Sequence, residues 1–327
     1  MIENRFPWHK SLVSDLNTAI DGDRLGHGLL IEGPHGLGKL DLAFLVAGAV
    51  LDKTPVVEDG RVQPPSHPDF RWVTLETDDK GRLRKQVTVD QVREACRALS
   101  LTSYAGGAKV TVVAPAERMN RNAANSLLKT LEEPNPDTLL ILVRARTDTL
   151  PATIASRCQR LRVPIPETGD AELWLREQHG DADWPRLLYL AGGAPLTAAD
   201  YATAGYEAVD GRFSEHMAGL LCGRMDPIEV AAEWASADQG LEGCLRWLSA
   251  WTDHVAWRRQ TGSWRVQPPV ETPETVIDAI PAAWIYWYRD EVHRAMRRMD
   301  GALNVELTLE NLLVPWAQGL EPQEGHG

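Results

Sequence analysis

One stretch decides the fold of this 327-residue chain, the run LLIEGPHGLGKL at residues 29–40. Its apolar start is typical of a buried strand, and the apolar run that continues to Leu51 favours a helix. Between the two, Gly33, Gly38 and Lys39 have the G-x-x-x-x-G-K spacing of a phosphate-binding loop, in which backbone N–H groups surround the phosphates and the lysine neutralises them. The order strand, glycine loop, helix predicts the first unit of an α/β fold.

The parts that a nucleotide hydrolase uses to hold magnesium are missing. Leu40 stands where such loops carry a serine or threonine hydroxyl. The valine-rich strand expected from Lys109 ends in Ala114 and Pro115 instead of an acidic pair, and the nearest carboxylate, Glu117, lies beyond them. Because positioning is most of what a protein contributes to phosphoryl transfer, we expect no meaningful ATP hydrolysis by this chain. Three alternatives stay open: ATP binding without turnover, slow hydrolysis that uses Glu117, and a tight turn with no ligand.

Elsewhere in the first half of the chain, apolar runs that suit strands alternate with segments that suit helices. Such alternation predicts a parallel sheet with helices on both faces. From Pro166 onward the pattern is helical, first in a small three-helix unit and then in a longer region that a proline-rich loop interrupts at 262–275. We therefore expect three domains, at residues 1–166, 167–205 and 206–327. The further strands expected are Phe70–Leu75, Lys109–Ala114, Thr138–Val143 and Gln159–Val163, and the helices between them are Thr88–Leu99, a helix after Asn122, and Ala152–Arg157.

The composition indicates a protein of the cytoplasm without a metal centre. With 34 basic and 46 acidic side chains the net charge is -12, so any contact with nucleic acid should be local or made through a complex. The first ten residues lack the apolar core of a signal peptide, and no stretch approaches the roughly 18 uncharged residues of a membrane span. The 4 cysteines have no metal-ligand spacing. Most of the 12 tryptophans fall in the last third, where we expect them to pack helices.

Two longer segments resemble the paired signatures of clamp loader subunits of the AAA+ class. They are NSLLKTLEEP at residues 125–134 and LPATIASRC at residues 150–158. The resemblance is strong over residues 1–165 and looser beyond them. It implies a RecA-like AAA+ parallel-sheet domain with a degenerate phosphate loop, then a small helical lid and an all-α C-terminal collar that holds an oligomer together. Shorter segments are similar to the delta-prime branch of the family, namely FPW at 6–8, GH at 26–27, HPD at 67–69 and VDQVR at 89–93.

The resemblance also implies an activity and partners. Assemblies of this family contain ATP-hydrolysing gamma or tau subunits and a delta subunit, and they place the ring-shaped sliding clamp on primed DNA for DNA polymerase III. In the family, the arginine of the Ser-Arg-Cys signature projects into the ATP site of the adjacent subunit. That role falls on Arg157 here, with Ser156 and Cys158 supporting the turn. The alternative is an arginine that pairs with a local acid.

Departures from the family pattern limit the cofactors that we expect. Many members carry a four-cysteine zinc module, but the corresponding interval, Asp52–Ser66, contains no cysteine, so we expect no zinc. The polar sensor that follows the fourth strand would fall near Arg144, and the sensor arginine of the second domain would fall near Leu196. Neither is therefore expected in usable form, which adds to the expectation of a chain that does not hydrolyse ATP.

A stand-alone DNA-binding protein is a further alternative. Its local basic cluster would consist of Arg118, Arg121, Arg144 and Arg146. The overall acidity of the chain argues against this class, because phosphate backbones attract proteins through Lys and Arg.

Overall fold

The computed structural model describes residues 1–78, 81–145, 150–299 and 303–318. The chain divides into two compact units, Met1–Asp170 and Ala171–Gly327. The first unit is built on a parallel sheet, and the second consists of helices in its described residues. The fold class predicted from the sequence, a RecA-like AAA+ sheet domain followed by helical regions, is confirmed. The predicted limits at residues 166 and 205 stay predictions.

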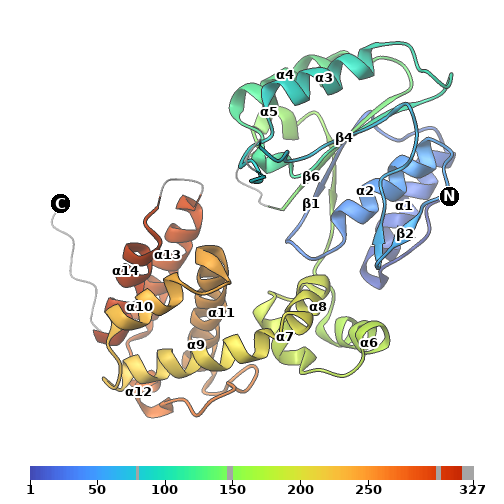
Figure 1. Ribbon diagram of the computed structural model, residues 1–327. Helices are drawn as coiled ribbons and strands as arrows, with labels where there is room; N and C mark the ends of the chain where they lie inside the picture. Colours follow the sequence, from blue (N-terminus) through green and yellow to red (C-terminus); the bar gives the residue numbers. More distant parts are fainter. Residues whose placement is uncertain (79–80, 146–149, 300–302, 319–327) are drawn as a thin grey trace. The chain divides into compact units, whose positions relative to one another are not determined.

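The sheet of the first unit has five parallel strands in the order β4-β5-β6-β1-β7. Figure 1 shows helices on both of its faces, with α1 and α2 on one side and α3, α4 and α5 on the other. The strands are β1 (Gly28–Glu32), β4 (Phe70–Val73), β5 (Lys109–Val113), β6 (Thr138–Arg144) and β7 (Gln159–Arg162). The helices are η1 (Pro7–His9), α1 (Lys10–Asp21), α2 (Lys39–Val50), α3 (Val89–Ser100), η2 (Ala116–Arg118), α4 (Arg121–Glu132) and α5 (Ala152–Ala155).

The central strands are apolar because helices cover both faces of the sheet. All residues of β1 and β5 are buried, which matches their continuous apolar runs. Helix α3 begins with the capping box that the sequence suggests, since Gln91 N donates to Thr88 Oγ1 at 3.3 Å and Thr88 N donates to Gln91 Oε1 at 2.8 Å. Helix α4 begins slightly earlier than predicted. Asn120, whose backbone is extended, caps it by accepting from Ala123 N at 2.8 Å, and Asn122 lies inside the first turn.

The proline-rich interval before β4 contains a short hairpin that the sequence analysis did not predict, formed by β2 (Val57–Glu58) and β3 (Arg61–Val62). Two side chains attach it to the rest of the unit. Asp41 Oδ1 on α2 accepts from Val62 N at 2.9 Å, and Arg5 donates to Gly60 O at 2.6 Å. The hairpin is too short for a pattern of alternating residues, so nothing in the sequence identified it.

The second unit is held together by buried tryptophans, as expected. Five of the eight tryptophans in the last third of the chain are less than 2% exposed: Trp234, Trp247, Trp251, Trp284 and Trp316. None of the helices in the described ranges is long and apolar enough to cross a membrane. The helices are α6 (Thr168–His179), α7 (Trp184–Leu190), α8 (Pro195–Thr203), α9 (Tyr206–Leu221), α10 (Pro227–Ala235), α11 (Gly240–Thr261), α12 (Glu274–Ala279), α13 (Ala282–Arg298) and α14 (Val305–Gln318).

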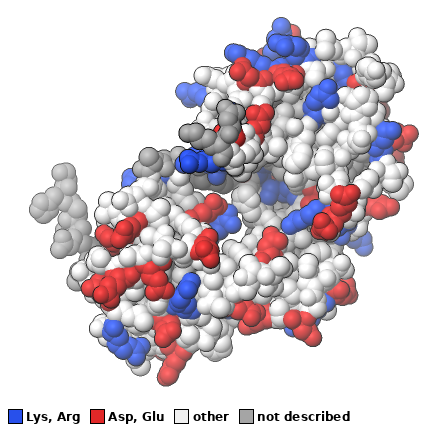
Figure 2. Space-filling view, viewed as in Figure 1, with Lys and Arg blue, Asp and Glu red and all other residues white. Residues whose placement is uncertain are grey.

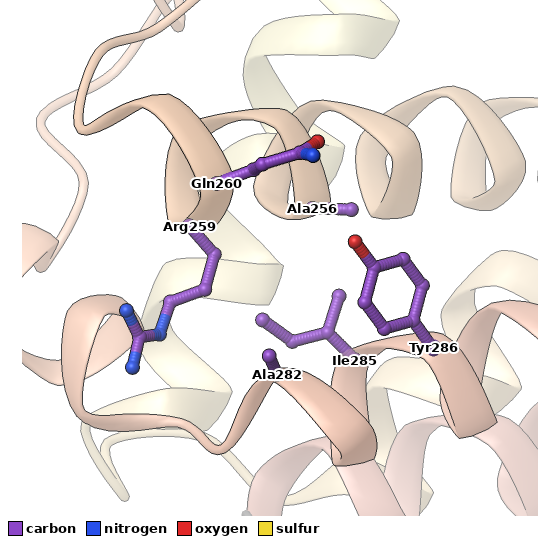
Figure 3. Close-up of a pocket in the computed structure, with 6 residues that line it drawn as sticks. All are labelled: Ala256, Arg259, Gln260, Ala282, Ile285 and Tyr286. Carbon is purple, nitrogen blue, oxygen red and sulfur yellow. The ribbon is translucent and has the colours of Figure 1, made fainter.

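A small pocket lies between α11 and α13, with a volume of about 100 Å³ (Figure 3). The one charged side chain that lines it, Arg259, is engaged locally, because its Nε donates to Ile280 O at 3.0 Å. No carboxylate or thiol lines the pocket, so it lacks the groups that acid–base or nucleophilic chemistry needs. The lining residues are Ala256, Arg259, Gln260, Ala282, Ile285 and Tyr286.

Candidate functional site

The predicted glycine loop connects the carboxyl end of β1 to the start of α2. Gly33 follows the last residue of β1, and Lys39 is the first residue of α2. Gly38 precedes the helix in the left-handed conformation, with φ 75°, and a Cβ there would lie 2.3 Å from Phe6 Cε2. Glycine is therefore required at this position both for its backbone conformation and for the close approach of the phenyl ring.

The lysine of the loop is turned back onto the loop itself. Lys39 is 7% exposed, and its Nζ donates to Pro34 O. Burial lowers the pKa of Lys39 to about 8, and the charge of Glu117 opposes this shift. Glu117, the acid considered for slow hydrolysis, is also engaged, because its Oε1 accepts from Ala145 N at 3.0 Å. Both side chains thus have partners within the chain.

The N-terminal segment lies against the same loop. Trp8 Nε1 donates to Leu37 O at 3.1 Å, and His9 Nε2 lies 2.7 Å from the same oxygen. Burial, together with the nearby charge of Lys39, lowers the pKa of His9 to about 4, although the hydrogen bond to Leu37 opposes the shift. His9 is therefore neutral at pH 7 and donates from Nε2 to the carbonyl. The loop is in this way covered by aromatic side chains of its own chain.

The structure places the residues that stand where related loops bind magnesium. Leu40 occupies the hydroxyl position at the start of α2, and Ala114 and Pro115 follow β5. Among the residues that the structure describes, no group of three His, Cys, Asp or Glu side chains could hold a metal ion.

The sensor positions predicted from the resemblance carry no free charge near the loop. Arg144, the last residue of β6, pairs with Glu32 at 2.5 Å, and Arg162 of β7 pairs with the other oxygen of Glu32 at 3.0 Å. Burial raises the pKa of the Glu32 carboxyl, but the hydrogen bonds and charges of the two arginines outweigh it and hold the pKa below its usual value. Leu196 is a buried residue of α8. Arg144 therefore serves as the buried partner of a carboxylate.

Arg157 lies at the opposite end of the sheet, in the turn between α5 and β7. Its Nη2 pairs with Glu132 Oε1 at 2.7 Å, and its Nη1 donates to Thr153 O at 2.8 Å. The side chains of Arg157 and Glu132 are 37% and 49% exposed. The structure thus gives Arg157 a local acid partner, while its guanidinium remains accessible from solvent.

The backbone around Arg157 is fixed by tight packing. His27 Nε2 lies 2.9 Å from Leu131 O, and a Cβ on Gly28 would lie 2.8 Å from Leu131 Cδ2 and 3.4 Å from Cys158 Sγ. Burial raises the pKa of Cys158 to about 11, so the residue is a packed thiol at neutral pH. Three motifs that are far apart in the sequence, GH, LEEP and SRC, therefore meet at one place.

Ser156 stabilises the turn that carries Arg157. Its Oγ donates to Thr153 O at 3.2 Å, and its backbone N donates to Ala152 O at 2.9 Å. Both contacts close the last turn of α5, directly before Arg157. The predicted supporting function of Ser156 is compatible with this geometry but stays a prediction.

Strand β1 separates the arginine from the loop of its own chain. Gly28 at its amino end packs beside Arg157, whereas Gly33 at its carboxyl end opens the loop. At roughly 3.3 Å per residue these ends are about 17 Å apart. An arginine at this edge of the sheet cannot reach a phosphate on its own loop, so any phosphate that it contacts must belong to another molecule.

Of the four arginines considered for a DNA-binding cluster, three lie in the described residues, and one of these three is buried. Arg144 is buried in its ion pair, Arg118 ends η2, Arg121 begins α4, and Arg146 lies outside the described residues. Figure 2 shows Lys and Arg side chains interspersed with Asp and Glu on the face it presents, without a continuous basic band.

Three features of the site were missed by the sequence analysis: the Glu132 partner of Arg157, the position of Glu32 between two arginines, and the cover that the N-terminal segment forms over the loop. Glu32 had a usable signal, because a carboxylate that ends an apolar strand is costly to bury without a cation. Glu132 had none, since several acids of the chain could have paired with Arg157 at the level of sequence.

Comparisons with known proteins agree on one family. The model of the family described as "DNA polymerase III, delta subunit" matches residues 8–167. The DNA polymerase III subunit delta' of Pseudomonas aeruginosa is 33% identical over 258 residues, which cover 76% of each chain. The subunit delta' of Bacillus subtilis is 36% identical over 184 residues, so the match spans about half of that relative and of this chain, 53% of each.

Among solved structures, a gamma-subunit-related protein of DNA polymerase III from Thermotoga maritima superposes with a TM-score of 0.46 at 21% identity, over 93% of this chain and 98% of the other.

Proposed function

The chain belongs to the delta' family of DNA polymerase III subunits, and on this basis we propose that it is the non-hydrolysing member of a clamp loader. In this proposal it assembles with ATP-hydrolysing gamma or tau subunits and a delta subunit. The assembly places a sliding clamp on primed DNA during replication. The chain contributes Arg157 to the ATP site of one neighbouring subunit.

One observation carries the proposal: Arg157 and the glycine loop of the same chain lie at opposite ends of β1. This separation restricts Arg157 to phosphates of other molecules. The guanidinium is 37% exposed, and the turn that carries it is held by packed neighbours at Gly28 and Leu131. A rigid backbone with an accessible guanidinium suits a group that must meet a phosphate across a subunit interface.

The chemistry of such a contact is well defined. A guanidinium is planar, remains charged at neutral pH, and can donate two parallel hydrogen bonds to phosphate oxygens. In nucleotide hydrolases an arginine supplied from another protein accelerates cleavage by roughly 10³ to 10⁵. In the proposed assembly, Arg157 would neutralise charge that develops on the transferred phosphoryl group of the neighbour's ATP.

The other end of β1 supports the part of the proposal that concerns hydrolysis by the chain itself. Lys39 donates to Pro34 O, Leu37 O accepts from Trp8 and His9, and Leu40 offers no hydroxyl to magnesium. A triphosphate would have to displace the lysine from its carbonyl before the loop could bind it. We therefore expect the isolated chain to turn over no ATP.

The test is the ATPase activity of the reconstituted assembly with clamp and primed DNA. In assemblies that sediment like wild type, we expect Arg157→Ala to lower turnover by a clear share, the contribution of the one ATP site that Arg157 serves. We expect the isolated chain to be inert. Arg160→Ala serves as the matched control, because that arginine lies three residues on and its Nε donates to Ala155 O. Turnover by the isolated chain, or unchanged turnover of the Arg157→Ala assembly, would refute the proposal.

A further inference from the structure

The ion pair between Arg157 and Glu132 has a consequence for the control of this site. Glu132 is the last residue of α4, and its carboxylate engages Nη2 of Arg157 at 2.7 Å. Nη1 of the same guanidinium donates to Thr153 O at 2.8 Å. Each edge that the guanidinium could offer to a phosphate therefore has at least one of its nitrogens already engaged.

We propose that Glu132 is a positioning residue that holds Arg157 in a resting conformation until a neighbouring subunit presents a phosphate. The inference rests on the proposed function, because it requires that Arg157 act on another subunit. Glu132 does not touch the nucleotide in this proposal. It acts only through the arginine, by competing with the phosphate for the same guanidinium.

The exposure of the pair makes this competition reversible. Both side chains are more than one third exposed, and ion pairs of this kind are weak because water and salt screen them. A buried ion pair would hold the arginine too strongly for a phosphate to displace the carboxylate. A weak pair instead leaves the arginine neutralised in the free subunit and yields it to a doubly or triply charged phosphate.

The backbone geometry supports a switch of the side chain alone. Leu131 O is 2.9 Å from His27 Nε2, and Leu131 packs against Gly28 beside Cys158, so the residues before Glu132 and after Arg157 are fixed to the same strand. Arg157 N also donates to Ile154 O at 3.0 Å. Rotation of the two long side chains is therefore sufficient to break the pair.

The chain provides a matched control in the next residue. Glu133 is an exposed carboxylate directly after Glu132, at the C-cap of α4, and the contacts described above do not involve it. Glu132→Gln and Glu133→Gln remove the same charge from the same turn of helix. A difference between the two variants then reports on the contact with Arg157 rather than on the field of the helix end.

The experiment measures kcat and KM for ATP of the reconstituted assembly with clamp and primed DNA. We expect Glu132→Gln to raise kcat between about 1.4-fold and 5-fold, the range that exposed ion pairs contribute, with KM unchanged and Glu133→Gln equal to wild type. The gain falls on kcat because the arginine is needed only as the phosphoryl group is transferred. The gain in kcat should shrink as the salt concentration rises from about 0.1 M to 1 M, because the Debye length falls from about 10 Å to 3 Å.

A second arm separates this inference from the proposed function. In an Arg157→Ala background, Glu132→Gln should have no further effect, and Glu132→Asp alone should lie between wild type and Glu132→Gln. If Arg157→Ala lowers turnover but Glu132→Gln lowers it too, or matches Glu133→Gln, the positioning role is wrong and the proposed function stands. If Arg157→Ala leaves turnover unchanged, the proposed function itself fails.

Discussion

The two ends of β1 carry the two kinds of group that a nucleotide hydrolase uses, and the chain treats them in opposite ways. At the carboxyl end the loop lysine, Lys39, is 7% exposed and bound to its own loop. At the amino end Arg157 is 37% exposed and is held by an exposed ion pair with Glu132 and a hydrogen bond to Thr153 O. The buried end contributes to the stability of the chain, whereas the exposed end contributes little and is available to a partner. Substitutions at the two ends should therefore differ in their effect on folding.

Glu32→Gln is expected to have the largest effect on stability. It removes the charge that compensates Arg144, whose side chain is 5% exposed, and an uncompensated buried charge typically costs about 3 to 5 kcal/mol. Urea denaturation followed by circular dichroism measures the loss. The double variant Glu32→Leu with Arg144→Met should recover most of it, since an apolar pair of similar size needs no compensation. An unfolding curve of Glu32→Gln that overlays wild type would contradict the role assigned to this pair.

Gly38→Ala tests the cover over the loop. The substitution places a Cβ 2.3 Å from the Phe6 ring at a φ of 75°, so it combines the cost of a left-handed alanine with overpacking, about 3 kcal/mol together. Gly60→Ala is the control, because Gly60 has a φ of 72° with nothing within 4 Å of its Cβ. It should lose only about 1 kcal/mol. Equal losses in the two variants would show that Phe6 does not press on the loop.

The pH dependence of stability tests His9 at the same end. Its pKa is lowered to about 4 in the folded chain from the usual histidine value of 6.5, so the unfolded chain binds the extra proton between these two values. Stability should fall as the pH drops from 6.5 towards 4, by up to about 3 kcal/mol from this group. His9→Gln keeps a donor for Leu37 O without titrating. The wild type should therefore lose more stability than His9→Gln over this window, and parallel profiles would exclude His9 as the cause.

Patterns of neighbouring residues predicted the fold well. The apolar runs of β1, β5 and β6 became the three central strands of the sheet, because helices on both faces leave no reason for polar alternation along them. The outer strands, β4 and β7, carry exposed residues and were predicted from shorter patterns. The glycine loop and the missing hydroxyl at Leu40 could also be predicted, since both depend on which residues occupy a few neighbouring positions. The β2–β3 hairpin was missed because two-residue strands carry no periodicity.

The side-chain contacts of the candidate site join residues that are far apart in the sequence, and the sequence does not specify which residues pair. Glu32 meets Arg144 across 112 residues, and Trp8 meets Leu37 across 29. The choice between a local partner and a free side chain for Arg157 could not be made before the position of Glu132 was known. Family resemblance indicated which arginine to consider, whereas its partner came only from the packing of α4 against β1.

Arg157→Ala is expected to have the smallest effect on folding, in contrast to the substitutions at the carboxyl end of β1. The pair with Glu132 is exposed on both sides, so its removal should change the free energy of unfolding by less than about 1 kcal/mol. The same urea titration measures this change, with Glu132→Gln as a second way to break the pair. A loss above about 2 kcal/mol in both variants would place the pair among the structural contacts, like that of Glu32. A small loss of stability, combined with reduced ATP turnover in the assembly, would mean that Arg157 serves the neighbouring subunit and contributes little to the folding of its own chain.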